Sequence, residues 1–321
     1  SWGVCTVSQH RSWSASIHAR AFSPGLAGHL PGFTRDEQEA CLVCHAPRRE
    51  QHVEYFARGH AATLDGVDCA ACHVRAFTRF GPRDVKNTPH GRVAGLPLFR
   101  QSEFCASCHQ FGPDGLAFNG KPLENTYEEW KASRFARDGI TCQSCHMPGK
   151  RHEFRGIHDP EMTRKGITVR AVRERQHIRL TATNVGAGHH LPTYTTPLIR
   201  IEISGDNKRR EHTIRRELAW DPRQGLREVR DTRLAAGENI LLTLDLPPDA
   251  PGQVVVTVDP GHDYHARIFP DLLASLGATL SAQAQTMLHS ARNTARAQIY
   301  ELYRLHCEPW GGHDTECVAP P

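Results

Sequence analysis

The sequence has little of what a membrane span or a pair of ordinary hydrophobic cores requires. No apolar stretch approaches the roughly 18 residues of a membrane-spanning helix, so we expect no membrane span. The length of 321 residues gives a soft expectation of about two domains. Only 39% of these residues are hydrophobic, however, and the mean hydropathy is −0.51. A chain with so few apolar side chains needs another source of buried apolar surface.

The sequence also lacks a concentration of positive charge. The formal net charge is only +4, and lysine and arginine are scattered along the chain rather than grouped. A surface that tracks nucleic-acid phosphates needs clustered cations. No nucleic-acid partner is therefore expected.

Methionine is scarce, with three residues, whereas there are eleven cysteines and 21 histidines. Eight cysteines form four Cys-x-x-Cys-His motifs: Cys41 and Cys44, Cys69 and Cys72, Cys105 and Cys108, and Cys142 and Cys145. In this motif the two thiols form thioethers with haem vinyl groups, and the adjacent histidine binds the iron. The sequence thus predicts four covalently bound haem c groups, with proximal ligands His45, His73, His109 and His146.

Zinc sites and redox dithiols also use Cys-x-x-Cys pairs. A zinc site needs four ligands and no histidine behind each pair, and a redox dithiol needs only one pair. Four copies, each followed by histidine, favour haem. Because haem c is attached outside the cytoplasm, we expect a periplasmic or extracellular protein, whose basic excess pairs with haem propionates. No secretory signal is visible, as in a chain that begins after signal cleavage.

The pattern along the chain predicts an α+β fold in three parts. Residues 1–165 are expected to form an irregular, mainly helical tetrahaem domain, in which each short helix ends in a motif. Porphyrin faces would supply its core, at roughly 20 kcal/mol gross per haem. Residues 166–260 alternate polar and apolar residues in short runs, which predicts a small antiparallel β-sandwich of immunoglobulin-like type.

Residues 261–321 are expected to form a C-terminal helix and a disulfide tail. Apolar residues recur at three- and four-residue steps from Leu280 to Leu302, which predicts an amphipathic helix. It could dock on the haem domain or on the sandwich. Cys307 and Cys317 flank a turn and, in an exported protein, predict a disulfide.

Each iron either has a second axial ligand or is five-coordinate. Met147 is adjacent to His146 and cannot reach the opposite face of the same haem, and only Met162 and Met287 remain. With four of the 21 histidines in motifs, seventeen lie outside them. Bis-histidine ligation is the economical interpretation, and it predicts low potentials because a thioether ligand would raise them.

A repeated frame surrounds several of these histidines. Its copies are Trp13-x-x-Ser16-x-His18-Ala19, Tyr55-x-x-Arg58-x-His60-Ala61 and Trp130-x-x-Ser133-x-Phe135-Ala136. The first copy, together with Gly66-Val67-x-Cys69-x-x-Cys72-His73 followed by His90, resembles the multihaem cytochromes c related to the tetrahaem electron carrier of nitrifying bacteria. The loop from Asn184 to Thr193 is similar to one in larger relatives that carry a C-terminal sandwich, although Tyr194 replaces a glycine common there.

The family pattern places a haem motif just before the first frame. Here that stretch reads Trp2-Gly3-Val4-Cys5-Thr6, with one cysteine and no histidine. We interpret Cys5 as the remnant of a lost haem site.

The resemblance and the repeat also suggest which histidines are the second, distal ligands of the irons. The resemblance implies His18, for the haem on Cys69 and Cys72, and also His90 and His189; the repeat adds His60. In the segment 152–158 the candidate is His158, ahead of His152, and His190 ranks behind His189.

These features predict electron transfer with other redox proteins as partners, not catalysis. One alternative is a subunit of a polymeric, haem-bearing filament, which would be a homo-oligomer. Another is a reductase of a small nitrogen or sulfur oxyanion, which would need one five-coordinate haem.

Overall fold

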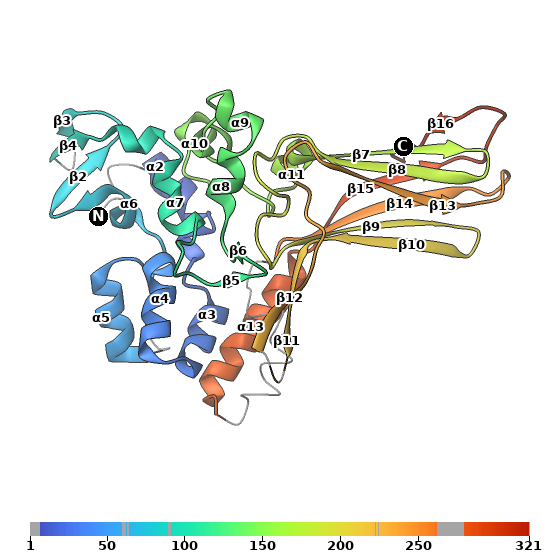
Figure 1. Cartoon of the computed structure of the whole chain (residues 1–321). Helices are drawn as coiled ribbons and strands as arrows, with labels where there is room; N and C mark the ends of the chain where they lie inside the picture. The colour runs from blue at the N-terminus through green and yellow to red at the C-terminus, as the bar shows by residue number, and fades with distance from the viewer. Residues whose placement is uncertain are drawn as a thin grey trace. The chain divides into compact units, whose positions relative to one another are not determined.

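The computed structural model describes residues 7–59, 62, 64–88, 91–261 apart from 222 and 224, and 279–320. The chain divides into two compact units. The first comprises Ser1–Cys108, Ile140–Arg155 and Asp263–Ala297, and the second comprises His109–Gly139, Gly156–His262 and Gln298–Pro321. Helices and antiparallel sheets are both present, which confirms the α+β class (Figure 1).

The first unit consists of short helices and one small sheet. The sheet has the strand order β1-β2-β4-β3, and its β2–β4 pair is parallel. The elements of this unit are α2 (Val7–Ser14), η1 (His18–Arg20), α3 (Pro24–His29), η2 (Leu30–Gly32), α4 (Arg35–His45), α5 (Arg49–Arg58), α6 (Cys69–His73), β1 (Val74–Arg75), β2 (Thr78–Gly81), β3 (Val85–Thr88), β4 (Gly91–Gly95), η4 (Pro97–Arg100), α7 (Glu103–His109, whose last residue begins the second unit), α10 (Cys142–His146), η5 (Pro148–Lys150) and α13 (Ala282–Ala297).

Helix α13 packs on α3 within this unit. A Cβ atom added to Gly28 would lie 2.9 Å from the Ala284 carbonyl oxygen and 2.9 Å from Leu288 Cγ, so the two helices approach closely. Met287 packs against the buried cluster around Leu26 and Leu30. The predicted helix is therefore confirmed, and it docks on the unit that carries most of the motif residues. It ends at Ala297, before the predicted limit, because the chain then continues as a strand.

The second unit contains a two-sheet sandwich. Its sheets have the orders β10-β9-β14-β15 and β13-β8-β7-β16. Inward-facing residues of both sheets, among them Ile178, Leu180, Ile201 and Val256, are fully buried in one core. The strands are β7 (Ile167–Glu174), β8 (His177–Asn184), β9 (Leu198–Gly205), β10 (Lys208–Ile214), β13 (Asn239–Asp245), β14 (Gly252–Asp259), β15 (Tyr300–Cys307) and β16 (Thr315–Glu316).

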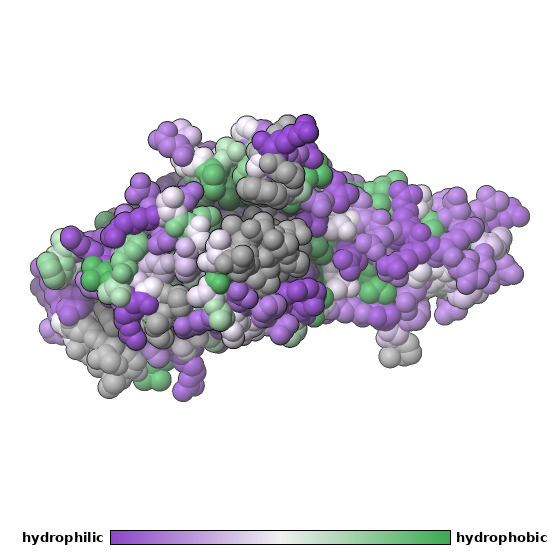
Figure 2. Space-filling model, turned by 90° about the horizontal axis from the view of Figure 1, so that it is seen from below, coloured by the Kyte–Doolittle hydropathy of each residue, from purple (hydrophilic) through white to green (hydrophobic). Residues whose placement is uncertain are grey.

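Strands β15 and β16 come from the C-terminal tail, which the sequence pattern does not assign to the sandwich. The predicted disulfide between Cys307 and Cys317 is present, and it links the end of β15 to the residue after β16. The outer surface of the sandwich is predominantly hydrophilic on the face seen in Figure 2. Ion pairs such as Arg200–Glu211 at 3.2 Å and Arg209–Glu211 at 2.8 Å contribute to that surface.

The second unit also carries short elements outside the sandwich. The ribbon β11–β12 is joined to the β5–β6 hairpin by Arg216, which is fully buried. Its guanidinium donates to Glu228 at 2.7 Å and to the Pro122 carbonyl at 2.6 Å. These elements are β5 (Ala117–Phe118), β6 (Lys121–Pro122), α8 (Thr126–Lys131), α9 (Arg134–Arg137), α11 (Pro160–Gly166), β11 (Arg216–Asp221) and β12 (Gly225–Asp231). Among the residues that the structure describes, none of the helices combines the length and hydrophobicity of a membrane span.

Candidate haem centres

Each of the four Cys-x-x-Cys-His motifs lies at the end of a short helix whose last residue is the motif histidine. Local capping explains where these helices begin. Asp68 accepts a hydrogen bond from the Ala71 amide at 2.9 Å at the start of α6, and Thr141 accepts one from the Ser144 amide at 3.3 Å at the start of α10. One helical turn then places both thiols and the imidazole on a single short segment. The prediction of short helices ending in motifs is confirmed.

None of the eight motif cysteines is in a disulfide, and all are half-buried. The thiols of Cys105 and Cys142 are hydrogen-bonded to each other, and Cys72 lies close to both Cys105 and Cys108. This hydrogen bond lowers the pKa of Cys142 to about 7, against the effect of burial, and raises the pKa of Cys105, which burial raises further. Thiols of three motifs therefore converge in the first unit.

The proximal histidines offer a test of whether these residues fit a haem. The Nδ1 atoms of His45, His73 and His146 lie 2.8, 2.8 and 2.5 Å from the backbone carbonyl oxygens of Ala21, Phe80 and Arg155. A carbonyl oxygen only accepts, so each Nδ1 carries the proton and each Nε2 carries the lone pair. Metal-binding histidines are commonly oriented in this way. These residues fit a haem.

The fourth proximal histidine, His109, has a different neighbour. Its Nδ1 lies 4.0 Å from a carboxyl oxygen of Glu124. Burial raises the pKa of Glu124 to about 7, while a hydrogen bond from Thr126 opposes the shift. The Phe111 amide donates to the Glu124 carbonyl at 2.8 Å, which holds the two segments together.

His18 lies in a segment that is fixed to the approach of the second motif. The Trp13 indole donates to the Val67 carbonyl at 2.8 Å, and the Val67 amide donates to the His18 carbonyl at 2.9 Å. Gly66 has φ +59°, and a Cβ atom there would lie 2.6 Å from the His18 carbonyl oxygen, so only glycine fits. The His18 ring contacts Phe154 edge-on, with centroids 4.1 Å apart.

The repeated frame around His18 has a structural counterpart. The Ser16 amide donates to the Trp13 carbonyl at 2.8 Å, and the Ser133 amide donates to the Trp130 carbonyl at 2.9 Å. Both serines are buried. The first and third copies therefore form the same turn.

His152 lies close to the motif histidine His73. Its ring centroid is 6.1 Å from that of His73, and two imidazoles on opposite sides of one metal have centroids about 6 Å apart, since each metal–nitrogen bond is about 2 Å long. Burial, and then the charge of His73, lower the pKa of His152. The Ser12 hydroxyl accepts a hydrogen bond from the His152 amide at 3.0 Å and fixes the backbone. The sequence analysis ranked His158 ahead of His152, because the sequence gives no information on which histidine packs near His73.

His189 and His190 have different surroundings in the second unit. His189 Nδ1 lies 2.8 Å from the His190 carbonyl oxygen, the arrangement seen at three proximal histidines. His190 Nδ1 instead lies 3.1 Å from the buried carboxyl of Glu129. Burial acts to raise the pKa of Glu129, but His190 and Arg233 outweigh it and lower that pKa. His190 therefore lies against a buried carboxyl group, whereas His189 lies against a backbone carbonyl.

The remaining candidates are less well defined. His60, His90 and Cys5 lie outside the described residues, and their predicted roles stay predictions. His158 is half-buried in the second unit, with its ring near Gly156.

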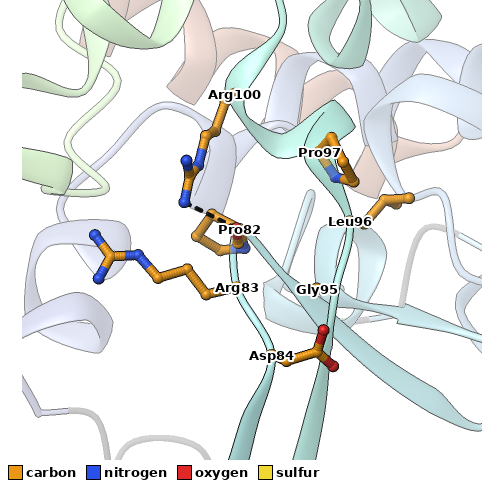
Figure 3. Close-up of a pocket in the computed structure, with 7 residues that line it drawn as sticks. All are labelled: Pro82, Arg83, Asp84, Gly95, Leu96, Pro97 and Arg100. Carbon is orange, nitrogen blue, oxygen red and sulfur yellow. Dashed lines mark hydrogen bonds between the residues drawn. The ribbon is translucent and has the colours of Figure 1, made fainter.

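A hollow of about 270 Å³ lies on the first unit beside the small sheet (Figure 3). It is lined by Pro82, Asp84, Gly95, Leu96, Pro97 and two arginines, Arg83 and Arg100. It contains no cysteine or histidine, so it is not a ligand site for iron.

Comparisons with known proteins agree with the haem motifs. Residues 3–74, which contain the first two motifs, match the family described as cytochrome c554 and c-prime. No curated protein sequence matches the chain. Among solved structures, a penta-haem cytochrome c552 from Thermochromatium tepidum is similar, with a TM-score of 0.63 and 16% identity, covering 98% of this chain and 97% of that chain.

At this identity the likeness shows the fold alone. That protein is described with five haems, whereas this sequence has four motifs. The motifs and the family match together support a multihaem cytochrome c with covalently bound haem.

Proposed function

We propose that this protein is an exported electron carrier with four covalently bound haem c groups. The proposal rests mainly on the four motifs at helix ends, three of which hold the proximal Nδ1 against a backbone carbonyl. Bound haem supplies a one-electron Fe(III)/Fe(II) couple. The protein residues attach the porphyrin through paired thiols and fix the imidazole tautomer that binds iron.

His152 and His73 would together hold one iron, because their ring centroids lie 6.1 Å apart. His18 then belongs to another iron, which changes the pairing expected from the sequence. His189 suits the iron bound by His109. The 2.5 Å contact between Thr126 and Thr193 supports this pairing, because it joins the loop of His189 to the segment beside His109.

Bis-histidine ligation would give low potentials, as suits transfer between other redox proteins in the periplasm or outside the cell. No observation on the described residues specifically supports the filament or the reductase.

Haem stoichiometry and spin state test the proposal. A pyridine haemochrome assay with intact mass should give four covalent haems per chain, and low-temperature EPR of the oxidised protein should show low-spin signals. Five haems would contradict the interpretation of Cys5 as a remnant. A stoichiometric high-spin haem would favour the reductase instead.

A further inference from the structure

The segment that forms the small sheet β1–β4 is rich in positive charge. Residues 74–100 contain six lysines and arginines and a single acidic residue, Asp84. All six cations are exposed: Arg75, Arg79, Arg83, Lys86, Arg92 and Arg100. The strand pairing puts Arg75 and Arg92 on one side of the sheet and Arg79 on the other, whereas Arg83 and Arg100 lie outside the strands. We call these six residues the basic sheet region.

Most of this charge is not neutralised locally. Arg92 lies 3.6 Å from Asp84. Within the described part of the chain, Arg79, Arg83 and Lys86 have no acidic side chain within 4 Å. In Figure 3, the Arg83 and Arg100 side chains extend to one side of the hollow, away from the Asp84 carboxylate. The basic sheet region therefore presents several cations to an approaching anion.

An exposed aromatic residue stands at the edge of the same sheet. Phe77 has a relative exposure of 104%, and it lies in the two-residue turn between β1 and β2. Both turn residues have positive φ, 44° for Ala76 and 60° for Phe77, a conformation usually left to glycine, asparagine or aspartate. A fully exposed phenylalanine in a strained turn is suited to contact with another molecule.

The basic sheet region is directly connected to the motif histidine His73. Strand β1 begins at the residue after His73, and His73 Nδ1 lies 2.8 Å from the Phe80 carbonyl oxygen in β2. A protein bound to the sheet would therefore lie close to the iron that His73 binds.

We propose that the basic sheet region, with Phe77, is the docking site for an acidic redox protein that exchanges electrons through the haem of the second motif. This inference rests on the proposed electron-carrier function. Opposite charge guides the encounter and raises the association rate. Phe77 contributes a desolvated apolar contact once the partner is bound.

The test uses stopped-flow reduction of the oxidised holoprotein by a dithionite-reduced plant-type [2Fe–2S] ferredoxin, an acidic protein of sufficiently low potential. The triple variant Arg79→Glu, Arg83→Glu, Lys86→Glu should react at least about tenfold more slowly at low ionic strength, and the difference should vanish in high salt. Phe77→Ala should react about fivefold more slowly at every salt concentration. Phe77→Leu should restore the rate.

A matched control carries the same charge change in the second unit: Lys208→Glu, Arg210→Glu, Arg223→Glu. Its rate should stay within about twofold of the wild type. As a second control, the neutral radical of photoreduced 5-deazariboflavin should reduce all variants equally, because it needs no docking charge.

Two results would overturn the docking proposal while the electron-carrier function stands. One is a sheet triple variant as fast with ferredoxin as the wild type. The other is a triple variant that is slowed with the neutral radical and shifted in haem potential, since that would make the cations partners of haem propionates. A wild-type protein that neither reductant reduces would overturn both proposals.

Discussion

At the scale of single residues, the four proximal histidines share one motif but differ in what holds the imidazole. His45, His73 and His146 direct Nδ1 at a neutral carbonyl oxygen, whereas His109 faces the carboxyl of Glu124. Four copies of the same motif therefore place their imidazoles in different surroundings.

Replacing His152 with alanine should open one iron. The ring that lies 6.1 Å from His73 would be lost, leaving that iron with an exchangeable site. EPR should show one high-spin haem in four, and CO should bind to the reduced form at one haem. The exposed His313 provides a matched control, since His313→Ala should leave every haem low-spin. A wholly low-spin His152→Ala protein would remove His152 from the ligand set.

Replacing His18 with alanine tests whether His18 and His152 serve different irons. The single variant should also give one high-spin haem, with a raised potential because an imidazole donor is lost. The double variant His18→Ala, His152→Ala should then give two. A double variant with one high-spin haem would mean that the two histidines compete for one iron. An entirely low-spin His18→Ala protein would show that His18 is no ligand.

His29 should make stability depend on pH. Burial lowers its pKa to about 4, from an ordinary 6.5. In this pH range His29 binds a proton in the unfolded chain but not in the folded chain. The free energy of unfolding therefore decreases as the pH falls from 6.5 towards 4. Between pH 7 and pH 5 the loss should be about 2 kcal/mol.

Guanidinium unfolding of the holoprotein at both pH values measures this loss. In His29→Gln the loss of unfolding free energy between pH 7 and pH 5 should be smaller by about 2 kcal/mol. The variant His313→Gln, at an exposed histidine, should behave like the wild type. Equal pH dependence in all three proteins would show that His29 is not the responsible group.

At the scale of elements, the two regular parts of the fold rest on different contacts. The sandwich strands alternate buried and exposed residues, as in β8 (His177–Asn184), and bury both inner faces in one core. Helix α13 instead packs closely on α3, where Gly28 has no side chain to keep the helices apart. The tail is thus divided, since α13 belongs to the first unit and β15 to the second.

Gly28→Ala should destabilise the contact between α3 and α13. The new methyl group would meet the Ala284 carbonyl at 2.9 Å, and overpacking of this kind costs about 1–3 kcal/mol. The gain in helix propensity of about 1 kcal/mol offsets only part of that cost. Thermal unfolding should therefore shift to lower temperature. Gly311→Ala, where nothing lies within 4 Å, should change little, and equal effects would contradict the packing.

At the scale of the whole molecule, buried apolar side chains are distributed unevenly. Among the residues that the structure describes, the sandwich core contains 20 buried residues, whereas the main cluster of the first unit contains seven. In the described residues of the first unit between Cys69 and Arg155, Ala71 is the only buried hydrophobic one. The segments that carry three of the four motifs therefore need haem as their core.

The full chain produced without haem attachment should be folded in one unit only. Limited proteolysis followed by mass mapping should cut residues 7–108 and 140–155 rapidly, while the sandwich strands stay protected by their own core. The holoprotein should resist cleavage in both regions. Equal protection of the first unit with and without haem would contradict the view that haem completes its core.

The sequence alone determined the haem chemistry, the short helices that end in motifs, the alternating strands and the Cys307–Cys317 disulfide, because each depends on spacing within a short stretch. The tertiary structure decided what depends on distant residues. It put His152 beside His73, separated His189 from His190 through the buried Glu129, and added β15 and β16 to the sandwich. A histidine has no local signature of the iron it will bind, since its partner is chosen by the packing of segments far apart in the chain.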